Sequence, residues 1–310
     1  MMDKKQAVEI RGALDKLTIQ RFKSLRRNLR ILKQDKNAMI GFLVIVVIVL
    51  VAIFAPWLAP YDYSEQHISS SFRGPTSTYW LGTDEFGRDL LSRIIWGTRP
   101  ALIVGVLSII VAIGIGVPIG ILAGYKLGWI DRTVTWAVDI MLSFSPLLFG
   151  LMIIIALGPG TSNLAFAIGL ANVAQFIRLS RGPTMALRDN DFIRAARALG
   201  ASDLRILFSH MLPNVIGPII IMGTLSMAGA IRTEASLSFL GYGIQPPLPS
   251  WGNLIRQGVE QILQSRWMAL FSGLALTVTV LAFNMVGDSL RDMLDPRELL
   301  TKARGKLDAF

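Results

Sequence analysis

Five long, predominantly apolar stretches of the sequence contain no aspartate, glutamate, lysine or arginine, and they limit what the chain can fold into. They lie between Lys36 and Asp62, Arg99 and Lys126, Asp139 and Arg178, Arg205 and Arg232, and Arg266 and Asp288. A helix that crosses a bilayer needs about 20 mostly apolar residues, and a charge at its centre costs roughly 2.5–3.5 kcal/mol on insertion scales. The windows therefore predict an all-α integral membrane protein.

The number of spans follows from the third window, which is long enough for two helices once residues 133–139 are added. The turn-forming segment 158–163 divides it. The sequence thus predicts six transmembrane helices, near 38–59, 100–124, 134–157, 163–180, 213–232 and 267–287. The first is expected to be a retained anchor, because it follows a long polar tail and its apolar stretch exceeds that of a cleavable signal peptide.

The positive charges predict the orientation. With six spans both termini lie on one side, and 24 of the 31 lysines and arginines fall on that side. The positive-inside rule places this side in the cytoplasm. The net charge of +10 is then a topology signal and an attraction to anionic membrane lipid, and it gives no reason to expect nucleic-acid binding.

Segment 82–89 superficially matches a phosphate-binding loop. Such a loop needs lysine followed by serine or threonine, whereas here Arg88 is followed by Asp89 and two acidic residues lie inside the loop. The better interpretation is a turn in which Thr83 or Asp84 caps a short amphipathic helix. We therefore expect no nucleotide site in this chain.

The residues needed for hydrolytic catalysis, metal binding or ion-coupled transport are also largely missing. The chain has no cysteine, and its histidines, His67 and His210, are predicted on opposite sides of the membrane, so no catalytic triad or metal cluster can assemble. An ion-coupled transporter would be expected to place several ionisable groups at mid-membrane. Only Asp139 lies in the body of a span, near the cytoplasmic end, where it could pair with Arg132. A purely structural membrane anchor remains compatible with the composition.

The predicted cytoplasmic loop 181–213 contains two short helices. Asn190 or Asp191 can cap the first, which stops at Gly200, and the second ends before Pro213. Small residues and arginines one turn apart suit a groove in another protein. They equally suit a helix lying on anionic lipid.

This loop resembles the cytoplasmic EAA loop of ABC importer permeases. The family pattern is Glu-Ala-Ala, three residues, glycine, nine residues and Ile-x-Leu-Pro. The matching residues here are Arg194-Ala195-Ala196, Gly200 and His210-Met211-Leu212-Pro213. The spacing is kept, while arginine replaces the glutamate and histidine replaces the isoleucine.

Three further segments carry a related resemblance. They are LGTDEFGRDLLSR at 81–93, SLSFLGYGIQPPLPSWGNLI at 236–255 and LAFNMVGDSLRDMLDPR at 281–297. All resemble C-type permease subunits of dipeptide, oligopeptide, nickel and glutathione importers. The resemblance implies a type I ABC importer permease fold and a bacterial cytoplasmic membrane location, with both termini cytoplasmic.

The family also implies the partners and the transported substrate. Such a permease pairs with a homologous B-type permease, and two cytoplasmic ATPase subunits bind the ATP and magnesium, so no cofactor is expected in this chain. An external binding protein delivers the substrate. Di- or oligopeptides are the expected cargo, with a nickel chelate or glutathione as alternatives.

Two sets of site residues follow from the resemblance. The set expected to couple to the ATPase is Asp191, Arg194, Ala195, Ala196, Arg197, Gly200, Ala201 and Ser202. The set expected to form an external gate or to contact the binding protein is Gly241, Gln245, Pro246, Pro247 and Trp251. A passive re-entrant loop is the alternative for the second set.

The predicted organisation has five parts. A basic cytoplasmic tail (1–37) and a first transmembrane helix (38–60) precede an external segment with the LGTD motif (61–99). A five-helix transmembrane domain (100–288) contains the coupling loop 181–213 and an external loop 234–266, and a cytoplasmic tail (289–310) ends the chain.

Overall fold

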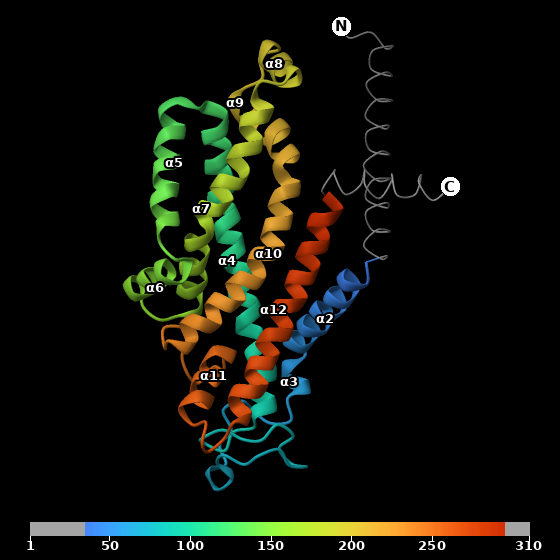
Figure 1. Ribbon diagram of the computed structural model, residues 1–310, viewed down its shortest axis with the longest axis vertical. Coiled ribbons are helices and arrows are strands. Elements are labelled where there is room, and N and C mark those ends of the chain that lie inside the picture. Colours follow the sequence, from blue (N-terminus) through green and yellow to red (C-terminus); the bar gives the residue numbers. More distant parts are fainter. Residues whose placement is uncertain (1–34, 295–310) are drawn as a thin grey trace, which may run out of the picture.

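Residues 35–294 are described by the computed structural model, and within that range every named element is a helix. Four of them are long and apolar enough to cross a bilayer, namely α2 (Lys36–Ile53), α4 (Leu90–Lys126), α10 (Leu212–Phe239) and α12 (Trp267–Leu294). For α10 the candidate span also includes the short helical turns that precede it. These helices run side by side in an elongated bundle (Figure 1). Nearly all of the predicted basic tail and most of the C-terminal tail lie outside the described residues.

The predicted single helix at 134–157 is wrong. The chain forms α5 (Gly128–Ser143) and α6 (Pro146–Leu157), which meet at 95°. The residue before a proline is pushed out of the helical region, and Ser145 is accordingly extended, with φ −61° and ψ 133°. Counted as one broken span, this pair raises the number of candidate spans among the described residues to five.

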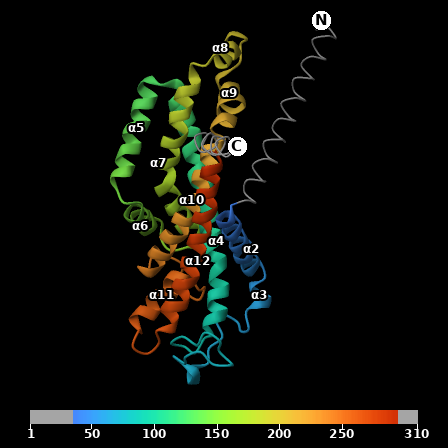
Figure 2. The same cartoon turned by 45° about the vertical axis from the view of Figure 1, so that its right-hand side comes forward.

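The fourth predicted span, at 163–180, corresponds to α7 (Thr161–Arg188), which is long enough to cross a bilayer. It is less apolar than the four long helices because Asn172, Gln175 and Arg178 interrupt its second half. α7 lies against α4 over much of its length (Figure 2). The six-span prediction is therefore not exactly reproduced.

The second predicted span begins earlier than expected. The amphipathic segment that we predicted to be a separate external helix forms the first turns of α4. Its cap is Asp89, whose Oδ2 accepts a hydrogen bond from the Ser92 amide at 2.8 Å, and not Thr83 or Asp84. At 37 residues α4 is about 55 Å long, so it extends beyond the roughly 30 Å hydrocarbon core.

The short helices lie at the two ends of the bundle. One end carries α8 (Asp191–Ala198) and α9 (Asp203–Ile206), and the opposite end carries α11 (Trp251–Glu260) and segment 61–89 (Figure 1). The prediction of a helix ending before Pro213 is wrong, because α9 continues through a π turn (η2, Leu207–Met211) directly into α10. Pro213 lies directly after this π turn, where the regular i→i−4 pattern of hydrogen bonds is already interrupted.

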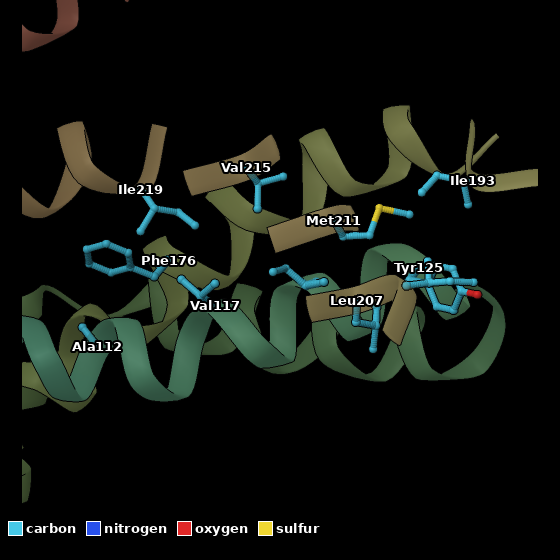
Figure 3. Close-up of a cluster of buried hydrophobic side chains, with 11 residues drawn as sticks. Ala112, Val117, Tyr125, Phe176, Ile193, Leu207, Met211, Val215 and Ile219 are labelled. Carbon is cyan, nitrogen blue, oxygen red and sulfur yellow. The ribbon is translucent and has the colours of Figure 1, made fainter. Parts of the chain in front are cut away.

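A buried cluster joins the bundle to its short-helix end (Figure 3). It combines Tyr125 of α4, Phe176 of α7 and Val215 of α10 with Ile193 of α8 and Met211 of η2. Ile193 and Met211 have no exposed surface. The position of α8 is thus set by the same apolar core that holds the long helices together.

Small residues let α4 and α7 approach closely. Gly116, Gly120 and Gly124 lie one turn apart on α4, as expected for a helix packed tightly against a neighbour. A Cβ atom on Gly120 would lie 2.4 Å from the Ile177 carbonyl oxygen of α7, closer than any real contact.

Replacing Gly120 by leucine should therefore force the two helices apart. We expect a loss of about 1–3 kcal/mol, the usual cost of overpacking a filled interior. Gly114 is the matched control, because it lies on the same helix and a Cβ there meets nothing within 4 Å. Thermal unfolding of the purified variants in detergent measures the difference, and equal midpoints for Gly120→Leu and Gly114→Leu would contradict the close packing.

Candidate functional site

The predicted coupling residues form a protruding helical hairpin at one end of the bundle. Asn190 occupies the N-cap position of α8 with an extended backbone, and Gly200 ends the turn after the helix with φ +82°. A left-handed conformation of this kind favours glycine. Both positions agree with the sequence prediction, but the Asn190 side chain makes no capping hydrogen bond to α8. Ile193 fixes the inner face of α8.

The outer face of this hairpin is open. Six of the eight predicted coupling residues are exposed, namely Asp191, Arg194, Ala195, Arg197, Gly200 and Ser202, while Ala196 and Ala201 are partly buried. Sequence reasoning missed two large apolar neighbours, Leu199 and Leu204, whose exposed fractions are 88% and 67%. Apolar side chains this exposed beside arginines are typical of a surface that another protein covers.

A polar network ties the hairpin to the end of α4. The Tyr125 hydroxyl donates to Asp203 Oδ1 at 2.7 Å and accepts from Arg197 Nη2 at 3.1 Å, while Lys126 pairs with Asp203. The hydrogen bond with Tyr125 also raises the pKa of Arg197 above its ordinary value. These contacts join α8 and α9 to the end of α4. Tyr125 and Lys126 were not predicted, because their partners lie more than 70 residues away.

The ion pairs of α5 differ from our expectation. Asp139 pairs with Arg178 of α7 at 2.8 Å and not with Arg132, and both partners are largely exposed. Asp131 accepts two hydrogen bonds from Arg181, also of α7. These pairs join α5 to α7, which favours a structural role for Asp139.

At the opposite end, the LGTD motif builds a buried ionic cluster. Asp84 is fully buried, and its Oδ2 accepts hydrogen bonds from Arg88 Nε at 2.6 Å and Arg93 Nη1 at 2.8 Å. Its Oδ1 accepts the amides of Phe86 and Arg88 at 2.9 Å. The motif therefore fastens segment 61–89 to the first turns of α4.

The loop between α10 and α11 presents four of the five residues predicted for an external gate or contact. Gly241, Gln245, Pro246 and Pro247 are exposed. Gln245 Nε2 donates to the carbonyls of Gly241 and Gly243 at 3.2 and 3.0 Å, which holds the loop together.

Trp251 is placed differently from the rest of that set. It is only 2% exposed, and its indole N–H donates to the Ile94 carbonyl of α4 at 3.1 Å. A Cβ atom on Gly97 would lie 3.1 Å from the indole ring. Trp251 therefore anchors α11 against α4, and in this conformation it is not available to a partner.

Within residues 35–294 no three histidine, cysteine, aspartate or glutamate side chains are grouped so that they could hold a metal ion. The structure has two separated exposed surfaces, the hairpin at one end of the bundle and the 241–248 loop at the other. Packed helices of the bundle connect them (Figure 1).

Comparison with known protein families shows to which family this chain belongs. The family described as binding-protein-dependent transport system inner membrane component matches residues 116–299, more than half of the chain. The chain belongs to this family. The N-terminal transmembrane domain of oligopeptide transport permease C also matches, over residues 24–75. The permease is thus a multi-pass inner-membrane protein of the ABC importer class, and its resemblance to C-type permeases is confirmed.

Several curated relatives cover most of this permease. It is 42% identical over 266 residues to the dipeptide transport system permease protein DppC of Alkalihalophilus pseudofirmus, covering 86% of this chain and 88% of the relative. It is 40% identical to the di/tripeptide transport system permease protein DppC of Pseudomonas aeruginosa, covering 85% and 89%. It is 39% identical to the glutathione transport system permease protein GsiD of Pectobacterium atrosepticum, covering 86% and 89%.

A solved structure supports the fold. A chain of the MetNI methionine ABC transporter, in an inward-facing conformation, superimposes with a TM-score of 0.55 and 18% identity, covering 66% of this permease and 98% of that chain. The predicted type I ABC importer permease fold is confirmed at this level, apart from the exact number of spans.

Proposed function

We propose that this permease forms part of the path by which di- or oligopeptides enter the cell through an ATP-driven importer. The 42% identity to a dipeptide permease over 86% of the chain is the observation that carries the proposal. Glutathione is the second candidate cargo, because a glutathione permease is 39% identical over the same share. Glutathione is itself a small peptide, so the two cargoes share their chemistry. The nickel-chelate alternative has no comparable support among these relatives.

The energy is proposed to come from partners. Two cytoplasmic ATPase subunits bind ATP and magnesium, a homologous B-type permease completes a heterodimer, and this chain carries no ATPase site or cofactor of its own. The excess of lysine and arginine supports cytoplasmic termini and places the α8 hairpin in the cytoplasm. The α10–α11 loop then faces the external binding protein.

In the proposed coupling step, the hairpin transmits the movement of the ATPase to the membrane helices. Closure of the ATPase on ATP moves α8 through its exposed residues, among them Asp191, Arg194, Ala195 and Gly200. The Tyr125 network passes the movement to α4, and the cluster around Ile193 passes it to α10. Rigid-body movement of packed helices opens the pathway alternately to the two sides, with no covalent chemistry in this chain.

The external loop is proposed to meet the binding protein through Gln245, Pro246, Pro247 and the neighbouring Leu248, which is 43% exposed. Leu248→Asp should reduce stimulation of ATP hydrolysis by the binding protein about tenfold, since a contact residue of this kind contributes roughly 1–2 kcal/mol. Leu263→Asp is the matched control, because Leu263 is 95% exposed at the same end of the molecule but outside this loop. Equal stimulation in both variants would count against the contact.

The assembly itself is tested by purifying the complex from the native membrane with an affinity tag on this permease. We expect a second permease, ATPase subunits and, after mild crosslinking, a binding protein that carries a small peptide. Recovery of the permease without any ATPase would argue against the proposal, and a binding protein loaded with a nickel chelate would overturn the peptide cargo.

A further inference from the structure

An apolar groove lies between α2, α4, α10 and α12. It has a volume of about 690 Å³, and its walls include Val49 of α2, Val106 of α4, Ile220 of α10 and Phe283 of α12. Thr224 is the one lining residue with a polar side chain, and its hydroxyl donates to the Ile220 carbonyl within the same helix. The groove therefore offers a surface suited to hydrocarbon.

A second hollow of about 450 Å³ continues the groove toward the end of α2. The two share Val49, Leu102 and Ile103 in their walls, and the second is also lined by Arg99. The pair thus forms one channel along α4, apolar along its length and carrying a cation near one end. We call it the Arg99 groove.

The guanidinium of Arg99 is held in place at this end. Its Nε and Nη2 donate to the carbonyls of Ala52 and Ile53 at 2.6 and 3.1 Å, and it lies 4.7 Å from the ring centre of Trp96. A guanidinium carries five N–H donors, so these two bonds leave capacity for an anion. The carbonyls belong to the last turn of α2, which fixes the cation at the end of that helix.

The length of the groove is closer to one leaflet than to the whole hydrocarbon core. From Arg99 to Ile113, the deepest lining residue on α4, the helix rises about 21 Å, compared with roughly 15 Å for half of the hydrocarbon core. A crossing helix from another subunit would need about 30 Å of groove. Trp57 lies one turn along the chain from Ile53, whose carbonyl Arg99 binds, and its 78% exposed indole is typical of the interface between membrane and water.

We propose that the Arg99 groove binds an anionic glycerophospholipid of the outer leaflet, with its phosphate on Arg99 and an acyl chain along Val106 and Ile220. The charge and the apolar length match the two parts of such a lipid. The bound lipid fills the space between α2 and the rest of the bundle. This site is separate from both the hairpin and the external loop, and its occupancy does not depend on which peptide is carried.

The test uses the full-length permease in liposomes and a phosphatidylglycerol probe with a photoreactive diazirine in its acyl chain. We expect labelling of peptides from α4 and α10 that line the groove. Arg99→Gln should lower this labelling about fivefold, since one basic residue attracts an anionic lipid by about 1 kcal/mol. Val106→Trp, which fills the groove, should lower it without removing the charge.

Arg266→Gln is the matched control. Arg266 lies at the same end of the bundle and stacks on Trp267 at 5.0 Å, much as Arg99 stacks on Trp96, but it does not line the groove. Labelling of the groove in Arg266→Gln should equal that of the unchanged protein. Equal groove labelling in Arg99→Gln, or labelling confined to other helices, would overturn the proposal.

An introduced cysteine shows whether the groove holds a protein helix instead of a lipid. The chain has none, so Val106→Cys introduces a single thiol. With lipid in the groove, an oxidant should produce no disulfide to a cysteine-scanned partner permease in the native assembly. An efficient disulfide at this position would place a protein helix in the groove and contradict the proposal.

Discussion

Asp84→Ala is expected to destabilise the external end of the permease by about 3–5 kcal/mol, because removing one partner of a buried ion pair leaves the other charges uncompensated. The side chains of Arg88 and Arg93 are only 8% and 4% exposed. Two backbone amides would also lose their acceptor. Thermal unfolding in detergent should show a much lower midpoint, and limited proteolysis should cut segment 61–89 first.

Asp139→Ala is the matched control for this prediction. It also removes an aspartate that pairs with arginine, but both partners are more than half exposed, so a cost below about 1 kcal/mol is expected. If Asp84→Ala is too unstable to purify while Asp139→Ala accumulates normally, the ranking is confirmed in the membrane itself. Equal midpoints and equal proteolysis would show that the buried cluster does not stabilise this end.

Ala195→Trp is expected to uncouple transport. Ala195 is exposed on the outer face of α8, and the helix is held by Ile193 on its inner face, so the indole should leave the fold intact. If the ATPase covers this face, the added bulk costs about 1–3 kcal/mol of fit and lowers peptide uptake about tenfold or more. Uptake, membrane level and co-purified ATPase are measured together.

Ala195→Ser provides the control for size, since it changes the same position with little added bulk and should keep most of the uptake. A membrane level equal to that of the unchanged protein in both variants separates coupling from folding. Normal uptake with a normal amount of bound ATPase in Ala195→Trp would mean that this face of α8 does not meet the ATPase.

The sequence predicted best what depends on local composition. The charge-free windows located α2, α4, α10 and α12, because a long apolar run is a requirement of the bilayer itself. The stop at Gly200 and the start of α8 near Asn190 were also predicted, since the positive φ of Gly200 and the extended backbone of Asn190 are local preferences of these residue types.

Features that depend on tertiary contacts could not be predicted. Nothing near Asp139 in the sequence indicates that Arg178, 39 residues later, is its partner. Trp251 was assigned to a contact surface because the Pro-rich loop precedes it, whereas the indole packs against α4. The continuity of α9, η2 and α10 was missed because Pro213 was interpreted as a stop, whereas it lies directly after the π turn inside a continuous helical segment.

The proposed activity is tested most directly by uptake of a radiolabelled dipeptide into proteoliposomes that contain the purified complex. Energy is supplied as ATP on the ATPase side, with the binding protein on the other side. We predict uptake that requires both ATP and the binding protein and that continues when a protonophore removes the proton gradient. Uptake that persists without ATP, or that a protonophore abolishes while ATP is held constant, would contradict the proposal and favour an ion-coupled transporter.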